Sequence, residues 1–192
     1  MEKEKIVLIG GGGHCRSVID VIEQQNRYEI IGIVDKKELL GRDVLGYKII
    51  ACDDSLETIF ETCKNAIITV GQIKTSEIRV KLFEKLQIIG FNFPTVISPL
   101  AYVSRHSCVS EGTIIMHHAL INSNVTIGKN CIINSKALIE HDSIIGDNCH
   151  ISTAAVVNGG VCVKNGTFYG SNATSKEDVS LEGFIKAGSL VK

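Results

Sequence analysis

The strictest pattern in the sequence is a six-residue repeat of branched aliphatic residues that begins after Pro99. Counting in steps of six gives eleven consecutive hits, which are Val103, Val109, Ile115, Ile121, Ile127, Ile133, Ile139, Ile145, Ile151, Val157 and Val163. A small residue stands two positions before nearly every hit, and side chains two residues apart share one face of a strand. Each hexad therefore presents one branched and one small side chain to the same side. The series continues more weakly through Tyr169, Ser175, Leu181 and Ala187.

A period of six residues is typical of a parallel β-helix, in which three short faces close one coil of about eighteen residues. We predict about five coils, with Gly, Asn and Asp residues at the corners because they tolerate the backbone angles of tight bends. Cys131 and Cys149 lie one coil apart at equivalent inward positions. They are expected to stack at the inter-strand spacing of about 4.8 Å, as small packing residues.

The residues before Pro94 follow a different pattern, in which apolar runs alternate with amphipathic stretches. Strands are expected at residues 5–9, 30–34 and 66–70, and helices at residues 14–25 and 74–87. This order predicts a Rossmann-like α/β unit with a parallel sheet. We therefore divide the chain into an α/β domain of residues 1–97 and a β-helix domain of residues 98–192.

Composition excludes several classes of protein. The 20 Lys and Arg residues against 21 Asp and Glu residues leave a formal charge of -1, which is not the electrostatic footprint of a general nucleic-acid binder. The apolar runs are too short to span a bilayer, and the first residues lack the order of a signal peptide. Seven cysteines without a C-x-x-C pair indicate reduced thiols. We expect a cytoplasmic protein that binds neither nucleic acid nor membrane.

Four consecutive glycines, residues 10–13, stand between the first expected strand and the first expected helix. Backbone N–H groups at such a turn can hold a phosphate or another polar group. The dinucleotide fingerprint G-x-G-x-x-G fails here, since Cys15 and Arg16 stand where its third glycine is needed. Asp35 and Gly71 end later strands, where a ligand crevice of a parallel sheet forms. The alternative is that the glycines only make a tight turn and Asp35 begins a loop.

The histidines of the repeat region are the candidate catalytic residues. His141 stands between Glu140 and Asp142, and a carboxylate that accepts its Nδ1 proton would orient the ring and leave Nε2 as a general base. His150 lies half a coil further on, so the two rings face different sides of one chain. They can meet in one site only if a neighbouring subunit supplies one of them. His117 and His118, at a bend, are expected to be merely solvated.

No metal site is expected. No two of the six histidines lie 18 or 36 residues apart, so stacking of coils does not gather them into a zinc site.

The outward positions of the repeat are largely apolar, which predicts a homotrimer, because identical flat faces pack readily around a three-fold axis. The residues concerned are Ile114, Leu120, Ile132, Leu138 and Ile144.

The combination of motifs resembles the family of sialic acid O-acetyltransferases and UDP-bacillosamine N-acetyltransferases, which are hexapeptide-repeat sugar acyltransferases. The matching stretches are residues 9–14, 69–71 and 139–152. The resemblance implies a small α/β domain followed by a left-handed parallel β-helix, with acetyl-coenzyme A as co-substrate. It also implies that His141 is the general base and that Asp142 orients it, although relatives usually carry Glu at that place. Whether Asp142 or Glu140 makes this contact stays open.

The resemblance further implies the residues that bind substrates. His150 would contact acetyl-coenzyme A, with the backbone around Ser171 and Ser189 along the pantetheine path. The residues implied for the nucleotide-sugar cradle are Gly12, Gly13, His14, Asp35 and Gly71.

The function expected from these implications is N-acetylation of a nucleotide-linked amino sugar in bacterial surface glycan biosynthesis. One alternative is O-acetylation of sialic acid or a related nonulosonic acid. Another, from a different class, is a catalytically silent β-helix that serves as a binding or oligomerisation module.

Overall fold

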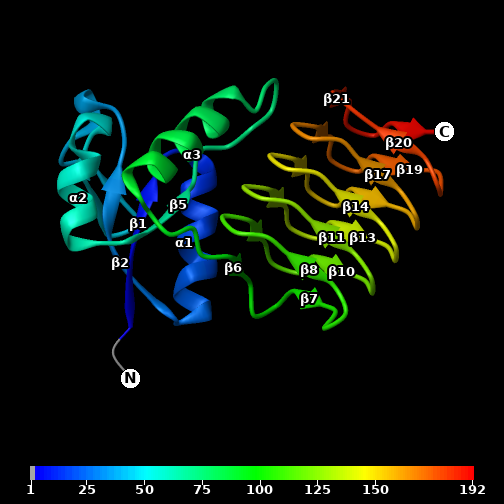
Figure 1. Cartoon of the computed structure of the whole chain (residues 1–192), viewed down its shortest axis with the longest axis horizontal. Coiled ribbons are helices and arrows are strands. Elements are labelled where there is room, and N and C mark those ends of the chain that lie inside the picture. The colour runs from blue at the N-terminus through cyan, green and yellow to red at the C-terminus, as the bar shows by residue number, and fades with distance from the viewer. Residues whose placement is uncertain (1–2) are drawn as a thin grey trace. The chain divides into compact units, whose positions relative to one another are not determined.

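The computed structural model describes residues 3–192, and the chain divides into two compact units (Figure 1). The first unit contains the residues up to 71 and residues 78–94, and the second contains residues 72–77 and 95–192. The second unit begins before the boundary drawn after residue 97, because β6 (Val96–Ile97) is already a β-helix strand. Ile97 lies one hexad before Val103, so the repeat starts one step earlier than it was counted. None of the helices within residues 3–192 has the length and apolar character needed to cross a membrane.

The first unit is built on a five-stranded sheet with the order β3-β4-β2-β1-β5. Its strands are β1 (Glu4–Ile9), β2 (Tyr28–Val34), β3 (Asp43–Val44), β4 (Tyr47–Ala51) and β5 (Asn65–Ile68). β1 pairs in parallel with β2 and β5, and β2 pairs in parallel with β4, so the predicted parallel α/β unit is confirmed. The antiparallel β3–β4 hairpin was not predicted, because β3 has only two residues and no apolar run marks it.

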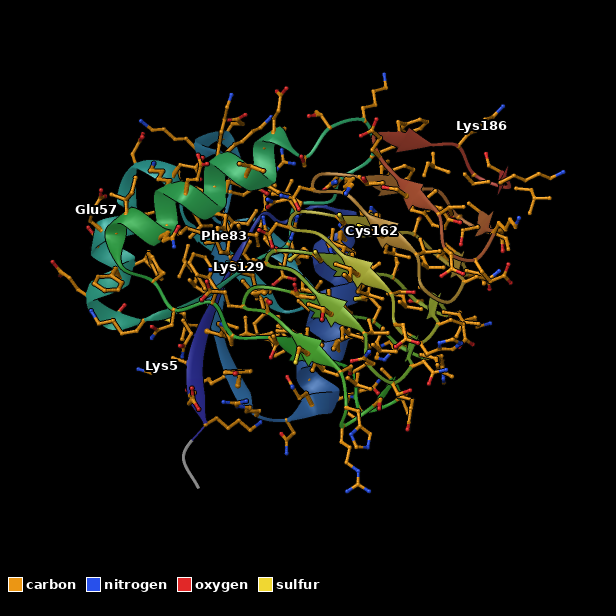
Figure 2. All side chains as sticks on the ribbon, turned by 45° about the vertical axis from the view of Figure 1, so that its right-hand side comes forward. Lys5, Glu57, Phe83, Lys129, Cys162 and Lys186 are labelled. Atoms are coloured by element: carbon orange, nitrogen blue, oxygen red, sulfur yellow. The ribbon has the colours of Figure 1, made fainter. Side chains whose placement is uncertain are left out.

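Helices complete the first unit and bury its sheet. They are α1 (Gly13–Gln25), α2 (Leu56–Thr62) and α3 (Glu77–Ile89), with 3-10 turns η1 (Lys37–Leu39) and η2 (Asp53–Ser55). Phe83, labelled in Figure 2, belongs to α3 and stacks in the core on Phe93, with ring centroids 4.2 Å apart. α3 begins three residues later than expected, because the Thr75 hydroxyl accepts the Glu77 N–H at 3.2 Å and residues 72–77 belong to the second unit.

The second unit is a parallel β-helix whose two-residue strands form three stacked sheets (Figure 1). The β6 face holds β6, β9 (Ile114–Ile115), β12 (Ile132–Ile133), β15 (His150–Ile151), β18 (Phe168–Tyr169) and β21 (Phe184–Ile185). The β7 face holds β7 (Tyr102–Val103), β10 (Leu120–Ile121), β13 (Leu138–Ile139), β16 (Val156–Val157), β19 (Thr174–Ser175) and β22 (Leu190–Val191). The β8 face holds β8 (Cys108–Val109), β11 (Thr126–Ile127), β14 (Ile144–Ile145), β17 (Cys162–Val163) and β20 (Ser180–Leu181). Faces of six, six and five strands confirm the predicted number of about five coils.

A left-handed backbone residue turns the chain at every sixth position. These residues are Gly112, His118, Asn124, Asn130, Lys136, Asp142, Asn148, Ala154, Gly160, Gly166, Asn172 and Asp178. Nine of these twelve are Gly, Asn or Asp, the residues for which the left-handed conformation costs least. The side chain of the second residue in each strand then points inward, and the central isoleucines are fully buried.

The stacked small inward residues also make hydrogen bonds to the backbone of the corners. Cys131 and Cys149 stack as predicted, and the Cys149 N–H lies 3.4 Å from the Cys131 sulfur. Each thiol donates to a corner carbonyl fifteen residues further along, Gly146 O at 3.1 Å and Lys164 O at 3.0 Å. The Thr113 hydroxyl makes the equivalent bond. This column therefore gives the corner carbonyls of Gly128, Gly146 and Lys164 a hydrogen-bond donor from inside the β-helix.

The hexad series ends at Leu181, one repeat earlier than expected. Only two residues separate β20 from β21, and one of them, Gly183, has a left-handed φ of 74°. This shorter corner pairs Ile185 with Tyr169, whereas Ala187 is exposed. The prediction that Ala187 continues the inward series is therefore wrong.

The alternation along one strand can be tested with neighbouring substitutions in β11. Ile127 is fully buried, whereas Thr126 is exposed. We expect Ile127→Ala to lower the free energy of unfolding by about 2–5 kcal/mol, because a buried cavity remains. Thr126→Ala is the control and should change it by no more than about 0.5 kcal/mol. Urea denaturation followed by circular dichroism measures both, and equal losses would contradict the assignment of inward and outward sides.

Candidate active site

The corner between β13 and β14 carries an exposed histidine–carboxylate pair. His141 Nδ1 lies 2.7 Å from Asp142 Oδ2, and the two side chains are 60% and 56% exposed. An ionised carboxylate only accepts hydrogen bonds, so Nδ1 carries the proton and Nε2 presents a lone pair. Within residues 3–192 no hydrogen bond engages Nε2. The pair is therefore arranged as a base with its accepting nitrogen open to solvent.

Two asparagines on the preceding coil decide which carboxylate serves His141. Asn124 Nδ2 donates to Asp142 Oδ1 at 2.6 Å, and Asn122 Nδ2 donates to Glu140 Oε2 at 2.6 Å. Asp142 thus holds the histidine, while Glu140 is held by Asn122. Asn124 was not among the residues predicted from the sequence, and the signal that identifies it is its position eighteen residues before Asp142.

The charges around this corner make His141 a stronger base. Its hydrogen bond to Asp142 raises the pKa of His141 above the ordinary imidazole value, and the carboxylates of Glu140 and Asp178 raise it further. The hydrogen bond from Asn124, with that from His141, lowers the pKa of Asp142. Asp142 therefore stays ionised, and the neutral base form of His141 predominates above the raised pKa.

His150 occupies a different place, on the outer side of β15 in the β6 face. The residue is 8% exposed, with Nδ1 2.6 Å from the Gln72 carbonyl and Nε2 3.2 Å from the Asn134 amide nitrogen. The expected separation of the two rings is confirmed, since His141 stands at the corner between the β7 and β8 faces. A direct contact of His150 with acetyl-coenzyme A stays a prediction.

Ser171 and Ser189 lie on the stretches that join the β6 face to the β7 face. The Ser171 hydroxyl is 2.9 Å from that of Ser152, and the Ser189 carbonyl accepts the Thr174 N–H at 2.9 Å. Both serines are partly exposed. The β7 face separates them from the His141 corner, so one chain does not bring these residues together.

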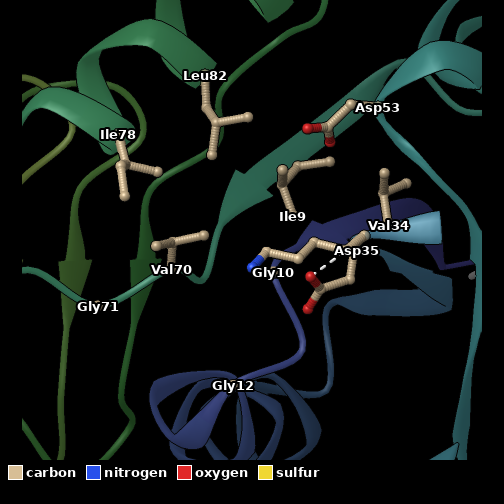
Figure 3. Close-up of a pocket in the computed structure, with 11 residues that line it drawn as sticks. Ile9, Gly10, Gly12, Val34, Asp35, Asp53, Val70, Gly71, Ile78 and Leu82 are labelled. Carbon is tan, nitrogen blue, oxygen red and sulfur yellow. Dashed lines mark hydrogen bonds between the residues drawn. The ribbon is translucent and has the colours of Figure 1, made fainter. Parts of the chain in front are cut away.

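A separate pocket of about 310 Å³ lies within the first unit (Figure 3). It is lined by Ile9, Gly10, Gly12, Val34, Asp35, Lys36, Asp53, Val70, Gly71, Ile78 and Leu82. Figure 3 shows apolar side chains of α3 on one side and the carboxylates of Asp35 and Asp53 on the other. The pocket brings together three of the residues expected to form the cradle, Gly12, Asp35 and Gly71.

Asp35 holds the glycine turn as well as lining the pocket. Its Oδ2 accepts the Gly11 N–H at 2.5 Å, and its Oδ1 accepts the Lys36 N–H at 2.7 Å. Two independent features require glycine at position 10. Its φ is 104°, and a Cβ there would lie 2.5 Å from Val70 Cγ2. At Gly12 a Cβ would meet nothing within 4 Å, so the space above the turn is open. Asp35 therefore does more than begin a loop.

Gly13 and His14 begin α1 and are not among the residues that line the pocket. A Cβ added at Gly71 would lie 3.7 Å from the His14 Cβ, so His14 adjoins the pocket at Gly71. Asp53 and the apolar wall of Ile78 and Leu82 were not predicted from the sequence. No local motif marks these residues, since distant elements supply them.

Together, the hexad β-helix, the α/β unit and the exposed histidine–aspartate corner define a hexapeptide-repeat acyltransferase. Residues 5–86 match the family described as the PglD N-terminal domain. The structure is similar to that of a variant of perosamine N-acetyltransferase from Caulobacter crescentus, solved with CoA and GDP-perosamine. That protein is 30% identical over 98% of this chain and 88% of its own, with a TM-score of 0.92.

Two further structures extend the comparison. The acetyltransferase domain of PglB from Neisseria gonorrhoeae is 25% identical over 99% of this chain and 92% of its own, with a TM-score of 0.91. WeeI from Acinetobacter baumannii shares the fold, at 20% identity, 99% and 97% coverage and a TM-score of 0.76. No curated protein matches the sequence. The chain belongs to the hexapeptide-repeat sugar acetyltransferases, with the α/β domain and left-handed β-helix expected from the resemblance.

The role of Asp142 can be tested by the substitution Asp142→Asn. Removing the carboxylate removes the main cause of the raised pKa of His141, so this pKa should fall. The neutral form of His141 then persists to lower pH, so the acid limb of the profile of kcat against pH should move to lower pH. The maximal rate should drop by less than the ~100- to 10,000-fold expected on removing a base.

NMR titration of the His141 ring measures the pKa directly. Glu140→Gln is the matched control, because Glu140 acts on His141 only through space and should lower this pKa by less. An unchanged pKa in Asp142→Asn would contradict the role assigned to Asp142.

Proposed function

We propose that this protein transfers the acetyl group of acetyl-coenzyme A to the amino group of a nucleotide-linked amino sugar, in bacterial surface glycan biosynthesis. The observation that carries the proposal is the chain of hydrogen bonds from Asn124 through Asp142 to His141, which leaves Nε2 open. Further support comes from the 30% identical perosamine N-acetyltransferase, whose structure contains CoA and GDP-perosamine. We place the reaction in the cytoplasm, because both substrates are cytoplasmic metabolites.

His141 acts on the attacking nitrogen. The neutral sugar amine attacks the thioester carbonyl, and Nε2 of His141 takes the proton that the nitrogen loses as the new C–N bond forms. The C–S bond then breaks, and the departing thiolate of coenzyme A takes up a proton. A positioned base contributes about 100- to 10,000-fold to such a step. Asp142 keeps the ring oriented and stabilises the imidazolium that forms.

The pocket of the first unit is the proposed site for the nucleotide sugar. N–H groups at the N-terminus of α1, from Gly12 and Gly13, favour a phosphate because the helix dipole adds to their hydrogen bonds. The Asp35 carboxylate lines the same pocket and has lone pairs left for a ribose or sugar hydroxyl. Gly71 and the adjoining His14 complete the proposed cradle.

For the coenzyme, we propose a path along Ser171 and Ser189. A neutral His150 ring that donates from Nδ1 to the Gln72 carbonyl carries a lone pair on Nε2, which lies 3.2 Å from the Asn134 amide nitrogen. A lone pair does not donate to a thioester oxygen. We therefore propose that His150 shapes this path indirectly, by holding Gln72 in place. Because His141 stands at another corner, a second copy of the chain completes the site.

A homotrimer is the proposed assembly. Fewer apolar residues are exposed to form its interface than the sequence indicated. Ile114 and Ile132 are fully buried within the chain, so the expectation that they form the subunit interface is wrong. Leu120 and Ile144 remain 38% and 52% exposed, and Leu138 is partly buried. These three flank the His141 corner on the β7 and β8 faces, where a partner is needed.

The proposed reaction is tested by incubating the protein with acetyl-coenzyme A and reading the release of free thiol. The acceptors are GDP-, UDP- and CMP-linked amino sugars, with free sialic acid in parallel. Thiol release with an amino sugar, and none with its N-acetylated form, supports N-acetylation. Release with sialic acid alone would establish the O-acetyltransferase alternative. No release with any acceptor, and no calorimetric binding of coenzyme A, would establish the silent module.

His141→Asn removes the base while keeping a polar side chain of similar reach. We expect kcat to fall by roughly 100- to 10,000-fold, with the dissociation constant of acetyl-coenzyme A within a few-fold. His118→Asn is the matched control, since His118 is an exposed corner histidine with a left-handed backbone and no proposed role. Wild-type turnover by a folded His141→Asn protein would refute the proposed mechanism.

The assembly is tested with Ile144→Glu, which places a charge on the exposed apolar surface beside the His141 corner. We expect light scattering to show a trimer for the wild type and dissociation for this variant. Turnover should be lost, because each site needs residues from two copies. Ile88→Glu, on an 86% exposed position of α3, should leave the trimer intact. A wild-type protein that is monomeric at micromolar concentration would contradict the shared site.

A further inference from the structure

Gly159 lies one coil beyond His141 in the same column of corner residues. The Gly160 N–H donates to the His141 carbonyl at 3.0 Å, and the Asp178 N–H donates to the Gly159 carbonyl at 3.0 Å. The column therefore places the backbone of Gly159 directly beside the His141 imidazole.

A side chain at position 159 would occupy the place of that ring. A Cβ built on Gly159 would lie 2.9 Å from Cε1, 3.0 Å from Nε2 and 3.4 Å from Nδ1 of His141. Carbon atoms in favourable contact lie about 3.5–4.0 Å apart. Gly159 does not have a left-handed φ, unlike its neighbour Gly160, whose φ is 70°. Its backbone conformation thus permits any residue, and the space taken by the imidazole is what requires glycine.

The backbone around Gly159 is too firmly held to absorb the clash. Asn158 donates from its backbone N–H to the Ser175 hydroxyl at 2.9 Å and from Nδ2 to the Ser175 carbonyl at 2.7 Å. On the other side, Gly160 is bonded to the coil below. The His141 side chain is 60% exposed, so its ring is the part that can swing away.

We infer that Gly159 is a positioning residue for His141, because the missing side chain gives the imidazole the place in which Nδ1 reaches Asp142 and Nε2 stays accessible. A methyl group at position 159 would turn the ring out of this place. The 2.7 Å bond to Asp142 would be lost, and the approach to Nε2 would be narrowed. The inference rests on the proposed function only for its effect on the rate, since the placement of the ring can be measured without turnover.

The test is Gly159→Ala in the full-length chain. We expect kcat to fall by about 10- to 100-fold, the cost of misplacing a catalytic group by about an ångström, with the dissociation constant for the nucleotide sugar unchanged. The NMR-measured pKa of His141 should fall, because the hydrogen bond that raises it is broken. Gly146→Ala is the matched control, since a Cβ there meets Asn165 and not His141. It should weaken the β-helix while leaving the pKa of His141 unmoved.

A double-substitution cycle keeps the inference testable if Gly159→Ala is poorly stable. In the wild-type background the substitution should lower the urea midpoint of unfolding, and in the His141→Ala background it should not, because the ring is gone. Equal lowering in both backgrounds would overturn the inference, as would an unchanged pKa of His141 with an unchanged kcat. If Gly159→Ala lowers this pKa while His141→Asn turns over at the wild-type rate, the inference stands and the proposed function fails.

Discussion

The arrangement of this protein depends on the backbone hydrogen bonds that join one β-helix coil to the next, in a register of eighteen residues as far as the shortened last corner. Ile121 pairs with Ile139, and Ile139 with Val157, so every corner residue is stacked on its counterpart one coil away. A left-handed residue at every sixth position keeps this register through the corners. As a result, side chains distant in sequence form columns, and the column at the corner of Asp142 assembles the proposed catalytic group.

This register explains how a largely exposed histidine can be well positioned. His141 is 60% exposed, and at such exposure a side chain is ordinarily free to move. Here the hydrogen bond to Asp142, itself held by Asn124 from the coil below, restrains the ring from one side. On the other side, Gly159 on the coil above has no side chain, and its backbone leaves room for the imidazole ring. Exposure and order are compatible because the restraints come from a rigid backbone.

In the glycine turn of the first unit, different glycines serve different purposes: one shapes the backbone, and another borders the proposed ligand pocket. Gly10 is demanded by its left-handed φ and by the closeness of Val70, and Asp35 ties the turn by accepting the Gly11 N–H. Gly12 meets no such constraint and borders the pocket. Within one run of glycines, some residues therefore build the turn and others keep the space above it open.

The sequence by itself determined the architecture, because a period of six with inward isoleucines such as Ile133 has only one way to bury its apolar side, and the length of a coil follows from it. It also singled out His141 with a carboxylate on either side, since these residues are neighbours in the chain and need no folding to lie together. The choice of Asp142 over Glu140 came only from the structure. Asn124 and the pocket residue Asp53 escaped it, since their partners are remote in sequence. The short last corner was likewise unpredictable, because two residues there close a turn that four close elsewhere. Only the tertiary structure decided these points, through the stacking of coils and of sheet edges that no local pattern encodes.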